Sequence, residues 1–218
     1  MLDSLISLYA PHQCIGCQTE GGLLCASCER ELPVVAPRCY NCRKLSNNGR
    51  TCQSCRRMSK LYGVQAVTAY EGFGKELIGR LKFSGARGAA ITVAHAMNQL
   101  SLSENSIIVP VPTATQRVRL RGYDQATLIA KALALQTGHD YAPSLRRLGQ
   151  LRQVGASRVQ RLKQIRNSFI VWNSEGIQGR DIVLVDDVMT TGATLESAAA
   201  TLKAAGGKRV EAVVFARA

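Results

Sequence analysis

The chain has 218 residues, of which 46% are hydrophobic and 20% charged, and its formal net charge is +13. This length accommodates one sizeable core and a smaller module, and no apolar run reaches the roughly 20 residues that span a bilayer, which excludes membrane insertion. The N-terminal segment has an acid at Asp3 and no basic stretch, which is not typical of a signal peptide, so we expect a cytoplasmic protein.

Cysteines dominate the first part of the chain, where all eight form four CxxC pairs between residues 14 and 55. A CxxC turn directs two sulfurs to one side, and two such pairs complete a closed four-thiolate zinc site. We therefore predict two structural zinc ions, held by Cys14, Cys17, Cys25, Cys28, Cys39, Cys42, Cys52 and Cys55. Pairing in sequence order and a crossed arrangement both stay open. An iron–sulfur cluster is a weaker alternative, and a disulfide framework is disfavoured in a chain without an export signal.

The rest of the chain alternates between strand and helix patterns. We place the cysteine module at residues 1–60 and a second domain at 61–218. Apolar periodicity predicts strands at residues 63–72, 106–112, 141–147, 168–172, 181–187 and 209–217, and helices at 75–83, 89–100, 124–138 and 194–206. This alternation predicts an α/β fold with a parallel sheet and right-handed crossovers. Residues 149–167 are too charged for a core and are expected to project as a hairpin or loop.

Positive charge is concentrated in the middle of the chain, where residues 112–180 hold 12 Lys and Arg against three acids. This excess favours a polyanionic partner, although a solvated basic face is the simpler alternative. Guanidinium groups suit phosphate oxygens. In a loop after the strand at 106–112, the candidate anion-binding residues are Arg117, Arg119, Arg121, Tyr123 and Gln125.

Three other titratable residues are interpreted as structural. Lys82 belongs to a predicted helix, and His95 and His139 stand in helical or turn contexts without partners. None of the three is assigned a catalytic role.

The stretch DIVLVDDVMTTGATLESAAATLKAAGG, residues 181–207, predicts a binding site. An apolar strand runs into two acids and then into a turn and a helix, and ligands of parallel sheets bind at the carboxyl ends of strands. Gly192 permits a tight turn whose amides, with the helix N-terminus, suit a phosphate. The acid pair can accept from vicinal hydroxyls or attract Mg²⁺. The pattern predicts a ribose 5-phosphate site made of Asp186, Asp187, Thr190, Thr191, Gly192, Ala193 and Thr194. An ordinary helix N-cap at Thr194 is the alternative.

This stretch closely resembles the phosphoribosyl pyrophosphate (PRPP) motif of the type I phosphoribosyltransferases. The order of a double zinc ribbon, VPVP, RLRGYDQATLIAKAL and this motif resembles the competence protein F family over almost the whole chain. The resemblance implies a central parallel sheet flanked by helices with a variable hood, and PRPP bound with Mg²⁺. The basic middle would then hold the pyrophosphate. Gln150 and Gln164 stand where the family usually has a threonine and an asparagine.

Two functions follow from these observations. The first is a phosphoribosyltransferase-like protein that binds PRPP and transfers phosphoribosyl to an acceptor that the sequence does not identify. The second is a nucleic-acid-handling protein of DNA uptake, which binds single-stranded DNA and keeps the fold without turnover.

Overall fold

A five-stranded parallel sheet forms the centre of the protein, in the order β1-β7-β6-β2-β3. The computed structural model describes residues 13–83, 87–148 and 168–218. The strands are β1 (Val64–Ala69), β2 (Ile107–Pro110), β3 (Asp140–Tyr141), β6 (Asp181–Met189) and β7 (Arg209–Arg217). The predicted α/β class and parallel sheet are confirmed, because β6 and β7 pair in register along their whole nine-residue length.

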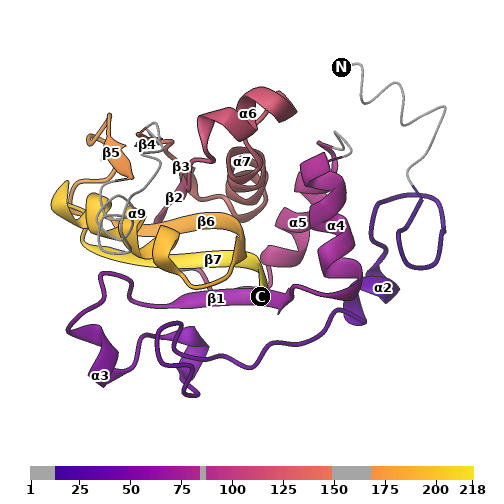
Figure 1. Ribbon diagram of the computed structural model, residues 1–218, viewed down its shortest axis with the longest axis horizontal. Helices are drawn as coiled ribbons and strands as arrows, with labels where there is room; N and C mark the ends of the chain where they lie inside the picture. The colour runs from indigo at the N-terminus through magenta and orange to yellow at the C-terminus, as the bar shows by residue number, and fades with distance from the viewer. Residues whose placement is uncertain (1–12, 84–86, 149–167) are drawn as a thin grey trace, which may run out of the picture.

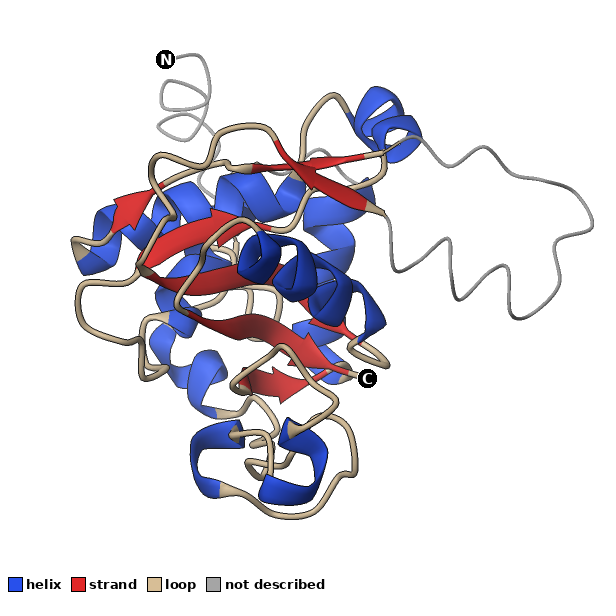
Figure 2. Ribbon diagram, turned by 90° about the vertical axis from the view of Figure 1, so that its left-hand side faces the viewer, coloured by secondary structure: helices blue, strands red, loops and turns tan. Residues whose placement is uncertain are grey.

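Helices cover both faces of the sheet (Figures 1 and 2). One face packs against α4 (Gly72–Phe83), α5 (Ala89–Met97) and α7 (Gln125–Thr137), and the other against α9 (Ala193–Ala204). Strand β6 shows why both faces are apolar. Val183 and Val185 belong to the core on the first face, and Ile182 and Leu184 to the core on the second. A strand covered on both sides reads as a continuous apolar run.

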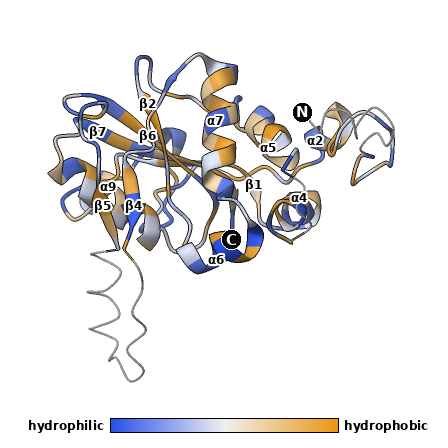
Figure 3. Ribbon diagram, turned by 90° about the horizontal axis from the view of Figure 1, so that it is seen from above, coloured by the Kyte–Doolittle hydropathy of each residue, from blue (hydrophilic) through white to orange (hydrophobic). Residues whose placement is uncertain are grey.

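One helix departs from the sequence prediction. Residues expected to form a loop fold as α6 (Thr115–Arg121), which buries none of its side chains. Figure 3 shows hydrophilic stretches on this helix, and its Leu120 is 82% exposed. A helix without a buried face has no apolar periodicity for a pattern search to detect.

A second, antiparallel sheet pairs β4 (Leu145–Arg147) with β5 (Phe169–Val171) beside the main one. The basic hairpin predicted at residues 149–167, including Gln150 and Gln164, lies outside the described residues.

The cysteine-rich residues wrap the edge of the sheet at β1 and reach both of its faces. The first half, with α2 (Ala26–Arg30), lies beside α4, and the second half, with η1 (Asn47–Gly49) and α3 (Gln53–Arg56), lies below β1 (Figure 1). Leu23 and Leu24 join the core of the first face, and Tyr40 joins that of the second. Between the halves, Val34 bridges to Thr68 of β1. The module is therefore built into the same cores as the sheet.

Within the described residues, no helix is long and apolar enough to cross a membrane.

Candidate functional site

A cleft of about 510 Å³ opens where β2 and β6 end, between α6, the end of α4 and the turn after β6. The carboxyl ends of parallel strands are the usual ligand-binding edge of such sheets. Its lining is polar and basic around one acid pair. It comprises Tyr70, Lys82, Val111, Pro112, Thr113, Ala114, Arg117, Arg121, Gln125, Arg147, Asp186, Asp187, Val188, Thr190, Thr194 and Ala218.

The acid pair, Asp186 and Asp187, lies in the cleft. Asp187 forms an ion pair with Lys82, with 2.7 Å between Oδ2 and Nζ. The Asp186 Oδ1 atom accepts a hydrogen bond of 2.8 Å from the Asp187 amide. Burial, and then the neighbouring charge of Asp187, raise the pKa of Asp186 to about 8. Asp186 is therefore largely protonated at neutral pH, and Lys82 neutralises the charge of Asp187.

The turn after β6 connects the acids to α9. Gly192 has φ +79° and is the N-cap of α9, which begins at Ala193. Only a residue without a side chain adopts this backbone freely. The Thr191 hydroxyl accepts from the Ala193 amide at 3.3 Å. Thr194 is not the N-cap, contrary to the alternative raised from the sequence, and with Thr190 it lines the cleft. We call residues 190–194 the phosphate loop.

The basic wall of the cleft comes from α6. Arg117 and Arg121 are one helical turn apart and both line the cleft, whereas Arg119 does not. From the sequence the three arginines were expected at alternating positions of a loop, but a helix brings positions four apart to the same side. Gln125 is buried and lines the cleft, and its Oε1 accepts from the Thr113 hydroxyl at 3.3 Å.

Tyr123 does not face the cleft. It is 9% exposed, and its hydroxyl donates to the Leu81 carbonyl at 2.5 Å. The side chain ties the start of α7 to α4, as a packing residue would, so the expectation of a cleft-facing Tyr123 is corrected.

Two cations of the cleft, Lys82 and Arg147, were not predicted from the sequence. Lys82 was interpreted as structural, yet it pairs with Asp187 across 105 positions of sequence. Arg147 of β4 also lines the cleft, donates to the Pro112 carbonyl at 3.5 Å and lies over the Phe169 ring. Burial lowers the pKa of Arg147, which the nearby Asp186 opposes. A single sequence offers no signal for contacts between such distant positions.

The cysteines gather into two clusters in sequence order, which settles the pairing that the sequence left open. Within each cluster all ligand atoms lie within 4.8 Å of one another. The Sγ atoms of Cys17 and Cys25 are 3.5 Å apart, as are those of Cys42 and Cys52. Tetrahedral zinc with bonds of about 2.3 Å to sulfur places its ligands close to this spacing. Both clusters therefore fit a structural zinc ion, and we call them the first and the second zinc site.

Each zinc site contains a serine that favours a thiolate. The Ser27 hydroxyl lowers the pKa of Cys25 to about 6, and the Ser54 hydroxyl does the same for Cys52. The two serines occupy equivalent places in CASC and CQSC. Metal binding requires deprotonated sulfur, which these two thiols supply most readily. In the same clusters the pKa of Cys28 is raised to about 12, mainly by burial, and that of Cys55 to about 12, mainly by its hydrogen bond with Cys52.

Comparison with known proteins shows that the chain is similar to phosphoribosyltransferase-type domains and to competence proteins. The family model "Phosphoribosyl transferase domain" matches residues 121–218. The chain is 27% identical to "Competence protein ComFC" of Bacillus subtilis, covering 75% of this chain and 77% of that protein. It is also 27% identical to "Competence protein F" of Haemophilus influenzae, over 89% and 90% of the two chains. "DNA utilization protein YhgH" of Escherichia coli is 31% identical over 62% of this chain and 63% of its own length.

Among solved structures, glutamine PRPP amidotransferase from B. subtilis aligns with a TM-score of 0.45 and 21% identity, covering 59% of this chain and 26% of the enzyme. An adenine phosphoribosyltransferase from Thermoanaerobacter pseudethanolicus aligns with a TM-score of 0.38 and 18% identity, over 63% and 83% of the two chains.

Proposed function

Because the chain belongs to the competence protein F family and has its phosphoribosyltransferase-type domain, we propose that the cleft binds PRPP together with Mg²⁺. One observation supports this proposal above the others. The acid pair, the phosphate loop and four cationic side chains converge on one cleft of about 510 Å³. PRPP presents a phosphate, two ribose hydroxyls and a pyrophosphate, and each has a chemically matched partner in this lining.

The ribose 5-phosphate end is assigned to the phosphate loop and the acid pair. Amides at the N-terminus of α9 and the hydroxyls of Thr190 and Thr194 would donate to the phosphate. Asp186 and Asp187 would accept from the ribose hydroxyls, either directly or through the hydration shell of Mg²⁺. Thr191, Gly192 and Ala193 contribute backbone to the same loop.

The pyrophosphate end is assigned to the cations opposite. Arg117 and Arg121 reach the cleft from α6, Lys82 from α4 and Arg147 from β4. Arg119 and Tyr123 are left out of this assignment. Bidentate guanidinium groups bind phosphate oxygens well, and Mg²⁺ supplies further neutralisation of the pyrophosphate when bound.

If phosphoribosyl is transferred, the contribution of these residues is positional and electrostatic. The bond from ribose C1 to the pyrophosphate oxygen breaks through an oxocarbenium-like state, and the electron pair leaves with the pyrophosphate. Lys82 and the arginines stabilise that leaving charge, while the acid pair and the phosphate loop hold the ribose ring. The acceptor and the catalytic residues are not assigned.

Calorimetry with PRPP and Mg²⁺ tests this function. Wild type is expected to bind, while Asp186→Asn and Asp187→Asn bind more weakly. Asp181→Asn is the control, because Asp181 is at the opposite end of the same strand and pairs with Arg209 at 3.3 Å. A wild-type protein that binds neither PRPP nor ribose 5-phosphate would refute the proposal.

We also propose that residues 1–60 form a structural double zinc ribbon and that residues 61–218 form the PRPP-binding domain. The two four-cysteine clusters support this division, and closed four-thiolate sites leave no position for substrate.

A second candidate function, the handling of single-stranded DNA, is favoured by an exposed aromatic platform. Arg146 of β4 lies 4.5 Å from the ring centre of Trp172, which is 48% exposed. The indole N–H of Trp172 is anchored on the Pro143 carbonyl at 2.6 Å. Paired arginine and aromatic side chains stack on bases without reading their sequence.

Trp172 is the only tryptophan of the chain, so its fluorescence reports on this platform alone. Binding of an oligothymidylate is expected to quench it, with an affinity that falls steeply as salt rises. The Trp172→Ala variant should bind the same strand about tenfold more weakly. A lack of binding at low salt would reject this function.

A further inference from the structure

The second zinc site touches the phosphate loop through Tyr40, which lies between Cys39 and Cys42. Tyr40 is 7% exposed and belongs to the core under α9. Its ring lies directly on Gly192, since a Cβ atom built on that glycine would be 2.7 Å from the Tyr40 Cδ2 atom. A residue held by the second zinc site thus covers the turn at which α9 begins.

The Tyr40 hydroxyl continues this contact into α9. It donates to the Glu196 carboxylate at 2.6 Å. Glu196 lies in the first turn of α9, and it also accepts from the Ser59 hydroxyl at 3.0 Å and the Lys60 amide at 2.6 Å. These donors, Tyr40, Ser59 and Lys60, lie within the second zinc site or in the segment that directly follows it.

The other end of the phosphate loop is held by Arg43, the residue after Cys42. Its Nη2 atom donates to the Thr190 carbonyl at 3.3 Å. The backbone of Arg43 has φ +66°, and its amide closes the knuckle turn by donating to the Cys39 carbonyl at 2.9 Å. A zinc ion bound by Cys39 and Cys42 would fix this turn, because the two sulfurs lie on either side of it. Tyr40 and Arg43 both take their positions from the turn.

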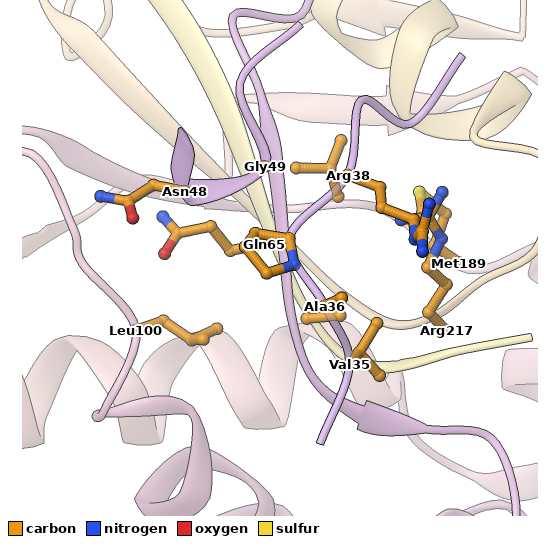
Figure 4. A pocket seen from close by; sticks show the side chains of 12 residues that line it. Val35, Ala36, Arg38, Asn48, Gly49, Gln65, Leu100, Met189 and Arg217 are labelled. Carbon is orange, nitrogen blue, oxygen red and sulfur yellow. The ribbon is translucent and has the colours of Figure 1, made fainter. Parts of the chain in front are cut away.

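Few residues make the contacts between the second zinc site and the phosphate loop. A hollow of about 150 Å³ is lined by residues 35–38 and 48–49, by β1 and by the ends of β6 and β7, although Gly49 itself packs against the Val64 carbonyl of β1. Figure 4 shows the side chains of Arg38 and Arg217 together near Met189, at one side of this lining. Next to this hollow, the second zinc site is connected to the loop region through Tyr40 and Arg43.

The first zinc site packs elsewhere. A Cβ atom on Gly16, between Cys14 and Cys17, would meet the Phe73 ring of α4 at 3.0 Å. Cys14 and Cys28 belong to the core of the opposite sheet face. Among the described residues, the hydrogen bonds of its cysteines stay within the N-terminal module and do not reach the phosphate loop.

We propose that the second zinc site positions the phosphate loop through Tyr40 and Arg43, so that its metal occupancy sets the affinity for ribose 5-phosphate, whereas the first site does not. Tyr40 is thus a positioning residue. This inference rests on the proposed function of the cleft. If losing the metal leaves the loop in its binding-competent form about a tenth of the time, the apparent affinity falls about tenfold.

The test compares Cys42→Ser with Cys17→Ser, which remove equivalent, exposed ligands of the second and the first site. Both variants are expected to hold about one zinc ion per chain. Cys42→Ser should bind ribose 5-phosphate at least about tenfold more weakly than wild type, and Cys17→Ser within about twofold. Equal weakening in both variants, or wild-type affinity in Cys42→Ser after loss of its zinc, would overturn the proposal.

Tyr40→Phe gives a second readout that keeps both metals. It retains the ring on Gly192 and removes the bond to Glu196, so affinity should fall about three- to tenfold with two zinc ions still bound. This variant decides the question if Cys42→Ser does not fold. Unchanged affinity would then contradict the proposal.

Hydrogen exchange separates this inference from the proposed function. Amides of residues 190–196 should exchange faster in Cys42→Ser and Tyr40→Phe than in wild type, but not in Cys17→Ser. If wild type binds no ribose 5-phosphate, the proposed function fails, and the exchange pattern still shows whether the second zinc site holds the loop. Equal exchange rates in all three variants would refute the positioning of the phosphate loop by the second zinc site.

Discussion

Replacing Asp186 by asparagine should make the ligand-free protein more stable while weakening its binding of PRPP. The substitution keeps the side-chain shape and an oxygen for the hydrogen bond from the Asp187 amide, which is 2.8 Å long. It removes a carboxyl group whose pKa is raised from the ordinary value of 3.8 to about 8 by burial and by the charge of Asp187.

The raised pKa fixes the sign of the effect. The native state holds the Asp186 proton more tightly than the unfolded state does, so the contribution of Asp186 to stability is fully present below pH 4. It is lost as pH rises toward 8. At pH 7 the solution is about three pH units above the ordinary pKa of 3.8. Each unit is worth about 1.4 kcal/mol, so the free energy of unfolding that wild type loses through Asp186 is at most about 4 kcal/mol. Because the side chain lines an open cleft near Lys82, we expect about 1–2 kcal/mol.

Urea unfolding of the zinc-loaded protein between pH 5.5 and 8.5 measures this difference. The free energy of unfolding of Asp186→Asn should exceed that of wild type by an amount that grows with pH. Asp181→Asn, which loses only its ion pair with Arg209, should be less stable than wild type by no more than about 1 kcal/mol at every pH. An Asp186→Asn protein that is less stable than wild type at pH 8, or a difference that does not change with pH, would refute the reasoning.

Three other outcomes are expected. Lys82→Ala should weaken PRPP binding about tenfold or more, because a charged partner of the ligand is lost. Lys75 is an exposed lysine of the same helix, so Lys75→Ala should leave the affinity unchanged. Calorimetry with PRPP compares the two variants. Gly192→Ala should lower the free energy of unfolding about 1 kcal/mol more than Gly179→Ala. Both glycines have positive φ, but only a Cβ at Gly192 meets Tyr40, and equal losses would deny that contact. Metal analysis should return about two zinc ions per chain, and chelation should lower the melting temperature by about 10 °C or more; fewer than one ion would contradict the ribbon.

The sequence predicted most of the elements that bury an apolar face. The strand and helix of residues 181–207 and the strand that follows were located because the strands are apolar runs and the helix repeats its apolar side chains at helical spacing. Helix α6 escaped because none of its residues is buried. Apolar periodicity arises because one face of a helix or strand is buried, so an element without a buried face shows no such periodicity.

The candidate site was only partly accessible to the same reasoning. The acid pair and the phosphate loop form one continuous stretch, and a local motif identifies them. Lys82 and Arg147 come to the cleft from α4 and β4, and only the fold brings them within reach of Asp186 and Asp187. The role of Tyr40 was hidden for another reason, since a residue within a CxxC pair is naturally interpreted as part of the metal site.

The charges of the ligand-free cleft explain how one site can hold two adjacent acids and four cations. Lys82 neutralises Asp187 at 2.7 Å, and Asp186 keeps its proton at neutral pH. PRPP with Mg²⁺ would offer both sets of groups better partners, because its pyrophosphate attracts Lys82 and the metal or the ribose hydroxyls attract the acids. Binding would then exchange an internal ion pair for two external ones and release the proton of Asp186. The ion pair and the protonated acid therefore stabilise the charged side chains when no ligand is bound. The binding free energy should be most favourable for a ligand that carries both phosphate and vicinal hydroxyls.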